Sequence, residues 1–338
     1  MKRVWPGIGC GLALWLGTPD LGAQPFYMPT RNRALFERGG AERFFVGTTG
    51  KPWTSGMFGC TRSSGGQFHE GLDIRCKERD SQGEPADEIL STADGVVVHA
   101  TTNPALSNYG NYLIVRHRID GLEVYSLYAH LSRVRDGISA GRSVRAGEVL
   151  GIMGRTANTR EQITRDRAHL HFEIGLRVSD HYVAWQQKHY PGQRNDHGEF
   201  NGRNFLGLDF VEIIREQAAR GKDFDLVRFL REQPELCRVV VRDTGFSWLR
   251  RYAALLERNP VAEREGVAGY ELRLNYVGLP CRVIPRAPSE LDSKSRIRLI
   301  SVNEAEQREH PCRKLVTRSG SQWKLTRTGE LLLDLLLQ

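Results

Sequence analysis

Three separated segments of the chain combine histidines with an aspartate, and side chains of these types can bind a metal and carry out hydrolysis. The segments are residues 69–73 (HEGLD), 128–132 (YAHLS) and 169–173 (HLHFE). They hold four of the ten histidines in the chain. Three side chains are enough to bind a catalytic zinc ion and leave one position open to water, and the remaining two can move protons. The pattern therefore predicts a hydrolytic metal site.

The spacing within the segments decides which side chains can face each other. His69 and Asp73 are four residues apart, so they share a face on a strand or on one helical turn. His169 and His171 are two apart, which places both on one face of a strand and Phe172 on the other. Either pair alone is more often a set of unrelated core or surface residues. The prediction therefore depends on all of them converging.

The residues around the segments predict short β-strands separated by turns. From about residue 86 to 176, apolar runs of strand length alternate with turn residues, and residues 120–121 (DG) are a hairpin signal. The expected strands are 96–99, 112–117, 122–128, a strand within 143–154, and 170–176. Short strands at this spacing indicate an antiparallel sandwich or open barrel, so the fold class is mainly β around a groove.

In this order, and spread over about a hundred residues, the three segments resemble the lysostaphin/LytM-type zinc endopeptidases of bacterial cell walls. The family pattern is HxGxD, then YxHLS, then HLHFE, and the resemblance covers about residues 65–176. It implies an antiparallel β groove that is open at the metal. It also implies that one zinc ion is bound by His69, Asp73 and His171, and that His130 and His169 are the two catalytic histidines.

The chemistry of these groups agrees with the implied roles. Two neutral imidazoles and one carboxylate leave a zinc ion with net positive charge, which lowers the pKa of a coordinated water toward about 7. No glutamate occupies the usual place of a general base. His130 and His169 are therefore left to accept the water proton, stabilise the oxyanion or protonate the leaving amine.

The expected function is that of a zinc-dependent endopeptidase that hydrolyses peptide cross-links of peptidoglycan. The first alternative is a catalytically silent scaffold of the same family that binds the wall or activates an amidase. Such relatives typically lack metal ligands, and this chain lacks none of the five site residues. A second alternative is a zinc peptidase that acts on proteins or free peptides.

Residues 155–168 depart from the family pattern, which has a short glycine-rich turn before the HLH sequence. Here the segment is long and carries several charged residues. We expect it to form one wall of the groove, where it could shape substrate choice or block access.

The N-terminus is typical of a secretory signal, because two basic residues precede a largely apolar stretch at 4–16 and small residues end at Ala23. That stretch is too short to span a bilayer. We therefore expect an exported protein, periplasmic or extracellular, without stable membrane insertion. The net charge of +8 suits an anionic partner such as the bacterial wall. Nucleic acid is not expected, because the sequence has no nucleic-acid-binding motif or basic stripe.

Five cysteines follow the expected cleavage point, and pairing is expected in an oxidising compartment. Cys60 and Cys76 flank the first segment. A bridge between them would close a loop of about fifteen residues and stabilise the fold by about 3 kcal/mol on the entropic model. We therefore predict a Cys60–Cys76 disulfide. Two of the other three, Cys237, Cys281 and Cys312, can pair, which leaves one over.

The chain is expected to divide into four parts. They are a signal peptide (1–23), an N-terminal lead-in (24–64), the LytM-type zinc peptidase domain (65–208) and a C-terminal α/β module (209–338). In the last part the spacing predicts helices at 210–220, 224–232, 248–258 and 328–338, and strands at 270–276, 281–284 and 297–302. Neither the role of this part nor the oligomeric state follows from the sequence.

Overall fold

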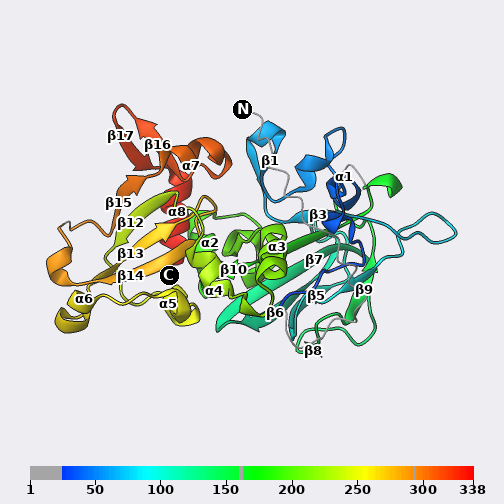
Figure 1. Cartoon of the computed structure of the whole chain (residues 1–338), viewed down its shortest axis with the longest axis horizontal. Coiled ribbons are helices and arrows are strands. Elements are labelled where there is room, and N and C mark those ends of the chain that lie inside the picture. Colours follow the sequence, from blue (N-terminus) through cyan, green and yellow to red (C-terminus); the bar gives the residue numbers. More distant parts are fainter. Residues whose placement is uncertain (1–24, 160–162, 293) are drawn as a thin grey trace.

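The computed structural model describes residues 25–159, 163–292 and 294–338, so the expected signal peptide lies outside the described residues. The chain is mainly antiparallel β-sheet with short helices, as the sequence predicts. Figure 1 shows the larger sheet in cyan and green on one side and a smaller sheet in yellow and orange on the other. Within the described ranges, no helix has the length and apolar character that a bilayer crossing requires.

The larger sheet has nine strands in the described residues and is built around β10 (His169–Arg177). This strand pairs antiparallel with β3 (Leu72–Arg75), β7 (Leu122–Val134) and β11 (Phe205–Gly207). The other strands are β4 (Glu88–Leu90), β5 (Gly95–Thr101), β6 (Asn111–Ile119), β8 (Ser143–Val144) and β9 (Val149–Met153). A separate two-stranded ribbon contains β1 (Gly59–Arg62) and β2 (Gln67–His69). The strand that carries two histidines is therefore an interior strand with fixed neighbours on both sides.

The predicted hairpin between β6 and β7 is confirmed. Asp120 and Gly121 both have positive φ, +48° and +80°, as a tight hairpin turn requires. Both faces of these strands are covered, because alternate residues enter two different apolar clusters. The larger cluster takes up Leu113 and Tyr128, and the smaller one takes up Tyr112.

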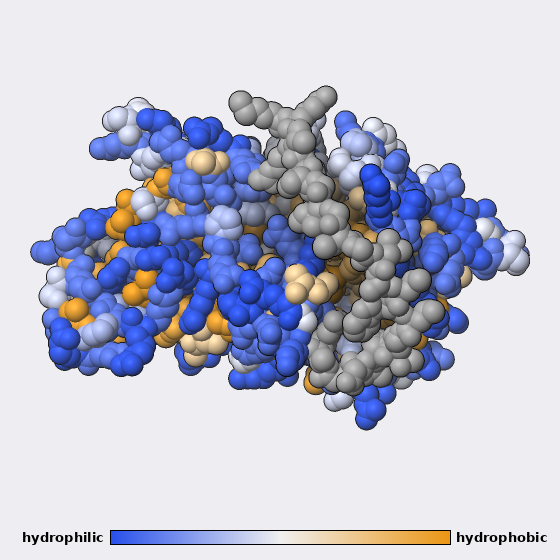
Figure 2. Space-filling model, viewed as in Figure 1, coloured by the Kyte–Doolittle hydropathy of each residue, from blue (hydrophilic) through white to orange (hydrophobic). Residues whose placement is uncertain are grey.

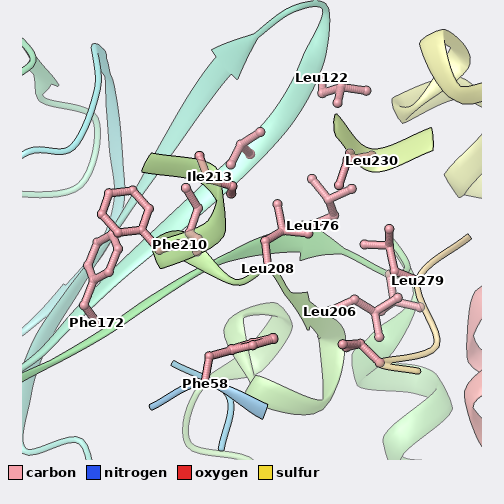
Figure 3. Close-up of a cluster of buried hydrophobic side chains, with 14 of the residues drawn as sticks. Phe58, Leu122, Phe172, Leu176, Leu206, Leu208, Phe210, Ile213, Leu230 and Leu279 are labelled. Carbon is pink, nitrogen blue, oxygen red and sulfur yellow. The ribbon is translucent and has the colours of Figure 1, made fainter. Parts of the chain in front are cut away.

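Helices α3 (Phe210–Arg220) and α4 (Leu226–Arg231) cover one face of the larger sheet (Figure 3). Asp209 caps α3 by accepting hydrogen bonds from the backbone N–H groups of the first turn. The ring of Phe210 meets that of Phe172 edge to face with centroids 4.8 Å apart. Phe172 therefore points into the core, on the face of β10 opposite to its histidines, as predicted.

The smaller sheet contains β14 (Pro280–Arg286), β13 (Gly269–Leu274), β12 (Cys237–Val241) and β15 (Ile297–Val302), in that order. A hairpin of β16 (Val316–Ser319) and β17 (Gln322–Leu325) follows. The remaining helices are α1 (Ala41–Phe44), α2 (Tyr182–His189), α5 (Ser247–Arg251), α6 (Pro260–Glu265), α7 (Glu304–Glu309) and α8 (Arg327–Leu336). One apolar cluster runs from the larger sheet through α3 and α4 into the smaller sheet. On the face shown in Figure 2, the described residues are largely hydrophilic.

The helix predicted at 248–258 is wrong over its second half. Helix α5 ends at Arg251, and the chain then turns and becomes extended. Leu256 forms an isolated bridge with Val283, and Glu257 donates its backbone N–H to the same residue. Pairing with β14 therefore replaces the helical hydrogen bonds that the local spacing favours.

The disulfide joins Cys60 to Cys312, with Cα atoms 5.5 Å apart, so the predicted Cys60–Cys76 pair is wrong. Cys76 is a buried free thiol that donates to the Glu78 carbonyl oxygen, and its backbone N–H donates to Ala168. Cys76 follows β3 beside β10, whereas Cys60 lies on the β1–β2 ribbon, which contacts the turn at Cys312. Although Cys60 and Cys76 are close in sequence, they lie on different parts of the fold. Cys237 and Cys281 are also buried free thiols.

Replacing Cys312 with Ser is expected to lower the free energy of unfolding by about 2–5 kcal/mol. The bridge joins residues 252 positions apart, so its loss frees a long loop in the unfolded chain. Urea unfolding followed by circular dichroism measures the change, and reduced wild-type protein is the control because it should unfold at the same urea concentration as the variant. An unchanged midpoint in the variant would show that the bridge does not support the fold.

Candidate metal centre

Three buried side chains on separate strands bring their donor atoms together. His171 Nδ1 lies 2.9 Å from Asp73 Oδ1 and 3.3 Å from His69 Nε2. His69 Nε2 lies 3.3 Å from Asp73 Oδ1. The edge of a tetrahedron around a zinc ion with bonds of 2.0–2.1 Å is about 3.3 Å. The donor types and their separations therefore fit a tetrahedral ion with a fourth position left for a non-protein ligand.

Strand pairing explains why these side chains meet. His171 and Asp73 are direct partners in the antiparallel pairing of β10 with β3, so their side chains emerge on the same face. Gly71 links β2 to β3 and passes very close to β10. A Cβ atom on Gly71 would lie 2.3 Å from the Phe172 carbonyl oxygen, so only glycine allows this approach without a shift.

The two metal-site histidines are oriented by hydrogen bonds on their far nitrogens. His69 Nδ1–H donates to the Met57 carbonyl oxygen at 2.8 Å, and His171 Nε2–H donates to Glu173 Oε1 at 2.8 Å. The Tyr109 hydroxyl donates to the same Glu173 oxygen at 2.8 Å. Such outer partners fix the tautomer and the ring orientation of a metal-binding histidine. Glu173 and Tyr109 belong to the site, although no role was predicted for either residue. The two-residue spacing of Glu173 from His171 is a signal that could have identified Glu173, because it places both side chains on one face of a strand.

The charges in this cluster depend on one another. Burial opposes ionisation of Asp73, but the surrounding histidines hold the pKa of this carboxyl group well below its usual range. Burial also disfavours the charged form of His171, yet its hydrogen bonds to Asp73 and Glu173 raise its pKa to about 9. Since only a neutral imidazole nitrogen binds a metal, binding at His171 would release a proton.

The remaining predicted site residues, His130 and His169, lie beside this cluster, so the structure brings all five together. The rings of His130 and His169 are 4.8 Å apart between centroids. His130 Nδ1–H donates to the Thr156 carbonyl oxygen at 2.8 Å, and His169 Nδ1–H donates to that of Arg167 at 2.7 Å. Each Nε2 is therefore left as the basic nitrogen. Burial lowers the pKa of both histidines.

A local irregularity in β7 aims His130. Its backbone φ is +63°, in the left-handed region that a residue with a side chain rarely adopts. Its N–H donates to the Tyr109 carbonyl oxygen, and the pairing of β6 with β7 shifts register between Asn111 and Leu113. Bulges of this kind redirect a side chain next to active sites. Strain of this kind costs about 1–3 kcal/mol and persists only where the surrounding structure enforces it.

Arg62, on β1, also enters the candidate metal site, and the sequence offered no reason to expect it. Its Nη2 lies 2.7 Å from His69 Nε2 and 2.8 Å from Asp73 Oδ2. The side chain is 26% exposed, so it has a route to solvent. The guanidinium donates to the same His69 nitrogen that a metal would use, so Arg62 and a metal ion exclude each other there. Arg62 reaches His69 because β1 pairs with β2, and this pairing is not apparent from the sequence.

Replacing Arg62 with Met is expected to raise zinc affinity by roughly tenfold to a hundredfold, because it removes charged hydrogen bonds that compete with the ion. Isothermal titration calorimetry of chelator-treated protein measures the dissociation constant. Arg264→Met, an exposed arginine on α6, is the matched control. A weaker affinity in the Arg62 variant would instead identify this residue as a support for Asp73 in the metal-bound protein.

The site opens into a cavity of about 490 Å³, which we call the metal-site cavity. Residues 157, 159, 163 and 167 line it, so the described part of the 155–168 segment forms one side, as expected. Arg155 and Arg165 both pair with Glu84, which holds this segment against the loop before β4. Residues 160–162 lie outside the described residues.

Comparison with known proteins identifies the family of this chain. The profile of Peptidase family M23 matches residues 67–184. Lipoprotein NlpD of Yersinia enterocolitica is 35% identical over 94 residues, which are 28% of this chain and 79% of that protein. The chain therefore belongs to peptidase family M23.

Other relatives match over smaller shares. Murein hydrolase activator NlpD of Escherichia coli (strain K12) is 35% identical over 112 residues, 33% of this chain, and the chain spans only 24% of its length. The catalytic domain of the antimicrobial peptidase lysostaphin from Staphylococcus simulans is 24% identical, with 35% of this chain and 74% of that chain covered and a TM-score of 0.24. A putative glycyl-glycine endopeptidase LytM from Ruminococcus gnavus is 28% identical, with coverage of 32% and 39% and a TM-score of 0.25.

Proposed function

We propose that this protein is a zinc-dependent endopeptidase that hydrolyses peptide cross-links of peptidoglycan. The observation that carries the proposal is the convergence of three metal-type donors with two further histidines on one cavity. The donors are His69, Asp73 and His171, and the two further histidines are His130 and His169. A metal site without such histidines could be structural, whereas this one has bases beside it.

Zinc bound at this site would supply a Lewis acid that polarises a peptide carbonyl and acidifies water. The chain itself supplies the proton transfers. Because the Nδ1 protons of His130 and His169 are held by backbone carbonyls, each Nε2 can accept a proton and later return it. One histidine takes the proton of the attacking water, and the other stabilises the carbonyl oxygen or protonates the leaving amine.

Peptidoglycan is proposed as the substrate because of the family and its relatives. The chain belongs to a peptidase family, and the Escherichia coli relative is named as an activator of a murein hydrolase. The net charge of +8 favours an anionic polymer. The Cys60–Cys312 disulfide suits an oxidising compartment, so we place the protein outside the cytoplasm, in the periplasm or beyond the cell.

Mass spectrometry of defined muropeptides tests the proposal. Zinc-loaded protein is incubated with cross-linked peptide dimers, and separately with an unfolded protein substrate. Conversion of dimers to monomers, with a new amino and a new carboxyl terminus at one bond, is the expected result. Dimers that stay intact while the protein substrate is cut would identify a general peptidase, and no cleavage of either would reject the enzymatic function.

A second candidate, a silent activator of another murein hydrolase, is favoured by two specific observations. Arg62 satisfies His69 and Asp73 without a metal, and the relative from Escherichia coli is itself named an activator. Under this alternative the purified protein would contain no zinc and would stimulate a separate amidase. Zinc content and stimulation, measured on the same preparation, separate the two functions.

A further inference from the structure

A second cavity of about 680 Å³ adjoins the metal-site cavity, and we call it the side cleft. The two cavities share Glu70, Asn108, Tyr109 and Glu173 in their linings, so one extended ligand can pass from one into the other. The side cleft lies between the larger sheet and the C-terminal part of the chain. Its walls include Phe68, Trp185, Tyr190, Arg203, Arg313 and Leu332.

Charge is distributed unevenly along this path. The carboxylates of Glu70 and Glu173 lie at the junction of the two cavities, whereas three arginines line the side cleft alone. Two of these arginines already have side-chain partners. Arg194 pairs with Asp196, and Arg203 lies over the Tyr190 ring and donates to Gln193. The third arginine, Arg313, is different.

Among the described residues no carboxylate forms an ion pair with Arg313, although the negative charge of Glu70 at the junction attracts it from a greater distance. The Arg313 Nε–H donates to the Val277 carbonyl oxygen at 3.3 Å, and its guanidinium carbon lies 4.9 Å from the centre of the Phe68 ring. The terminal nitrogens of this half-buried guanidinium form no hydrogen bond within the described residues. Partial burial takes away some of the hydration of this guanidinium, and a ligand anion in the side cleft would compensate for that loss.

The disulfide fixes Arg313 in this place. Cys312, the preceding residue, is bonded to Cys60 on β1, and Phe68 under the guanidinium is the neighbour of His69 on β2. A residue from the C-terminal part is thereby held beside the strand that carries a candidate metal ligand. Such restraint reduces the conformational entropy lost when a ligand binds.

We propose that Arg313 binds a carboxylate of the peptide substrate, which then extends through the junction to the metal site. The proposal rests on the proposed function, because it assigns a position to one part of the same substrate. The planar guanidinium suits a bidentate contact with a carboxylate. The aromatic and leucine side chains of the side cleft give apolar surface to the rest of the peptide.

Binding of a matched pair of ligands tests this proposal. One ligand is a cross-linked peptide dimer with free carboxylates, and the other is the same dimer with carboxamides in their place. Calorimetry on the full zinc-loaded chain, with His130→Ala to prevent turnover, gives both dissociation constants. Adding Arg313→Gln is expected to weaken binding of the carboxylate dimer on the order of tenfold or more and to leave the carboxamide dimer unaffected.

Arg264→Gln is the control for loss of one surface charge, and Arg313→Lys should recover only part of the affinity because it lacks the planar fork. Melting curves show whether each variant is folded. Equal weakening with both dimers, or none with either, would overturn the assignment of Arg313, whether or not the protein cleaves the dimer. Charge-dependent binding without any cleavage by the wild type would instead reject the proposed function and leave the assignment standing.

Discussion

Replacing His171 with Ala is expected to abolish cleavage and to weaken zinc binding by more than about a hundredfold. Loss of a residue that only orients a metal ligand costs up to about a hundredfold in affinity, and loss of the ligand itself should cost more. His171 provides a donor atom within 3.3 Å of the donors of both His69 and Asp73. With two donors left, the ion has no tetrahedral site. Elemental analysis after dialysis and calorimetric titration measure the loss of zinc, and muropeptide digestion measures the loss of cleavage.

The matched control for this variant is His181→Ala, which removes an exposed histidine before α2 and should change neither quantity. Circular dichroism must show that the His171 variant keeps its β-sheet content. Zinc binding and cleavage that both persist in a folded His171 variant would remove this residue from the metal site.

Replacing His130 with Ala is expected to separate catalysis from metal binding. The ring lies beside that of His169, but its Nδ1 is held by Thr156 rather than by a metal-site residue. Zinc content should therefore stay at one ion per chain, while the rate of cleavage falls by about 10²–10⁴-fold, the usual contribution of a general acid or base. Steady-state rates with a dimeric muropeptide, together with elemental analysis, measure both.

Loss of zinc in the His130 variant would mean that this histidine supports the ligand cluster and not the proton transfer. A further comparison uses His130→Asn. Asparagine tolerates the left-handed backbone found at this position, so it keeps the bulge but supplies no base. Equal rates for the Ala and Asn variants would assign the whole effect to the missing imidazole.

The sequence was sufficient to predict the centre of the site because strand periodicity is local. A two-residue spacing puts His169 and His171 on one face wherever the strand lies, and Phe172 on the other. The hairpin at residues 120–121 likewise depends only on its turn residues. The convergence of Asp73 with these histidines needed the order of the segments as well, because no local rule pairs β3 with β10.

What the sequence did not predict depends on contacts between distant segments. The disulfide partner of Cys60 lies 252 residues away, so proximity along the chain favoured the wrong cysteine. Arg62 reaches the metal site only because the β1–β2 ribbon folds over it. The second half of the 248–258 helix was lost to pairing with Val283, which competes with helical spacing only in the folded protein.

The most direct test of the metal site is anomalous diffraction at the zinc edge from crystals of the zinc-loaded protein. We expect one peak, about 2.0–2.2 Å from His69 Nε2, Asp73 Oδ1 and His171 Nδ1, with the Arg62 guanidinium withdrawn from His69. The result that would contradict the proposed metal site is the absence of a peak at this position in crystals grown with excess zinc, with Arg62 still bridging His69 and Asp73.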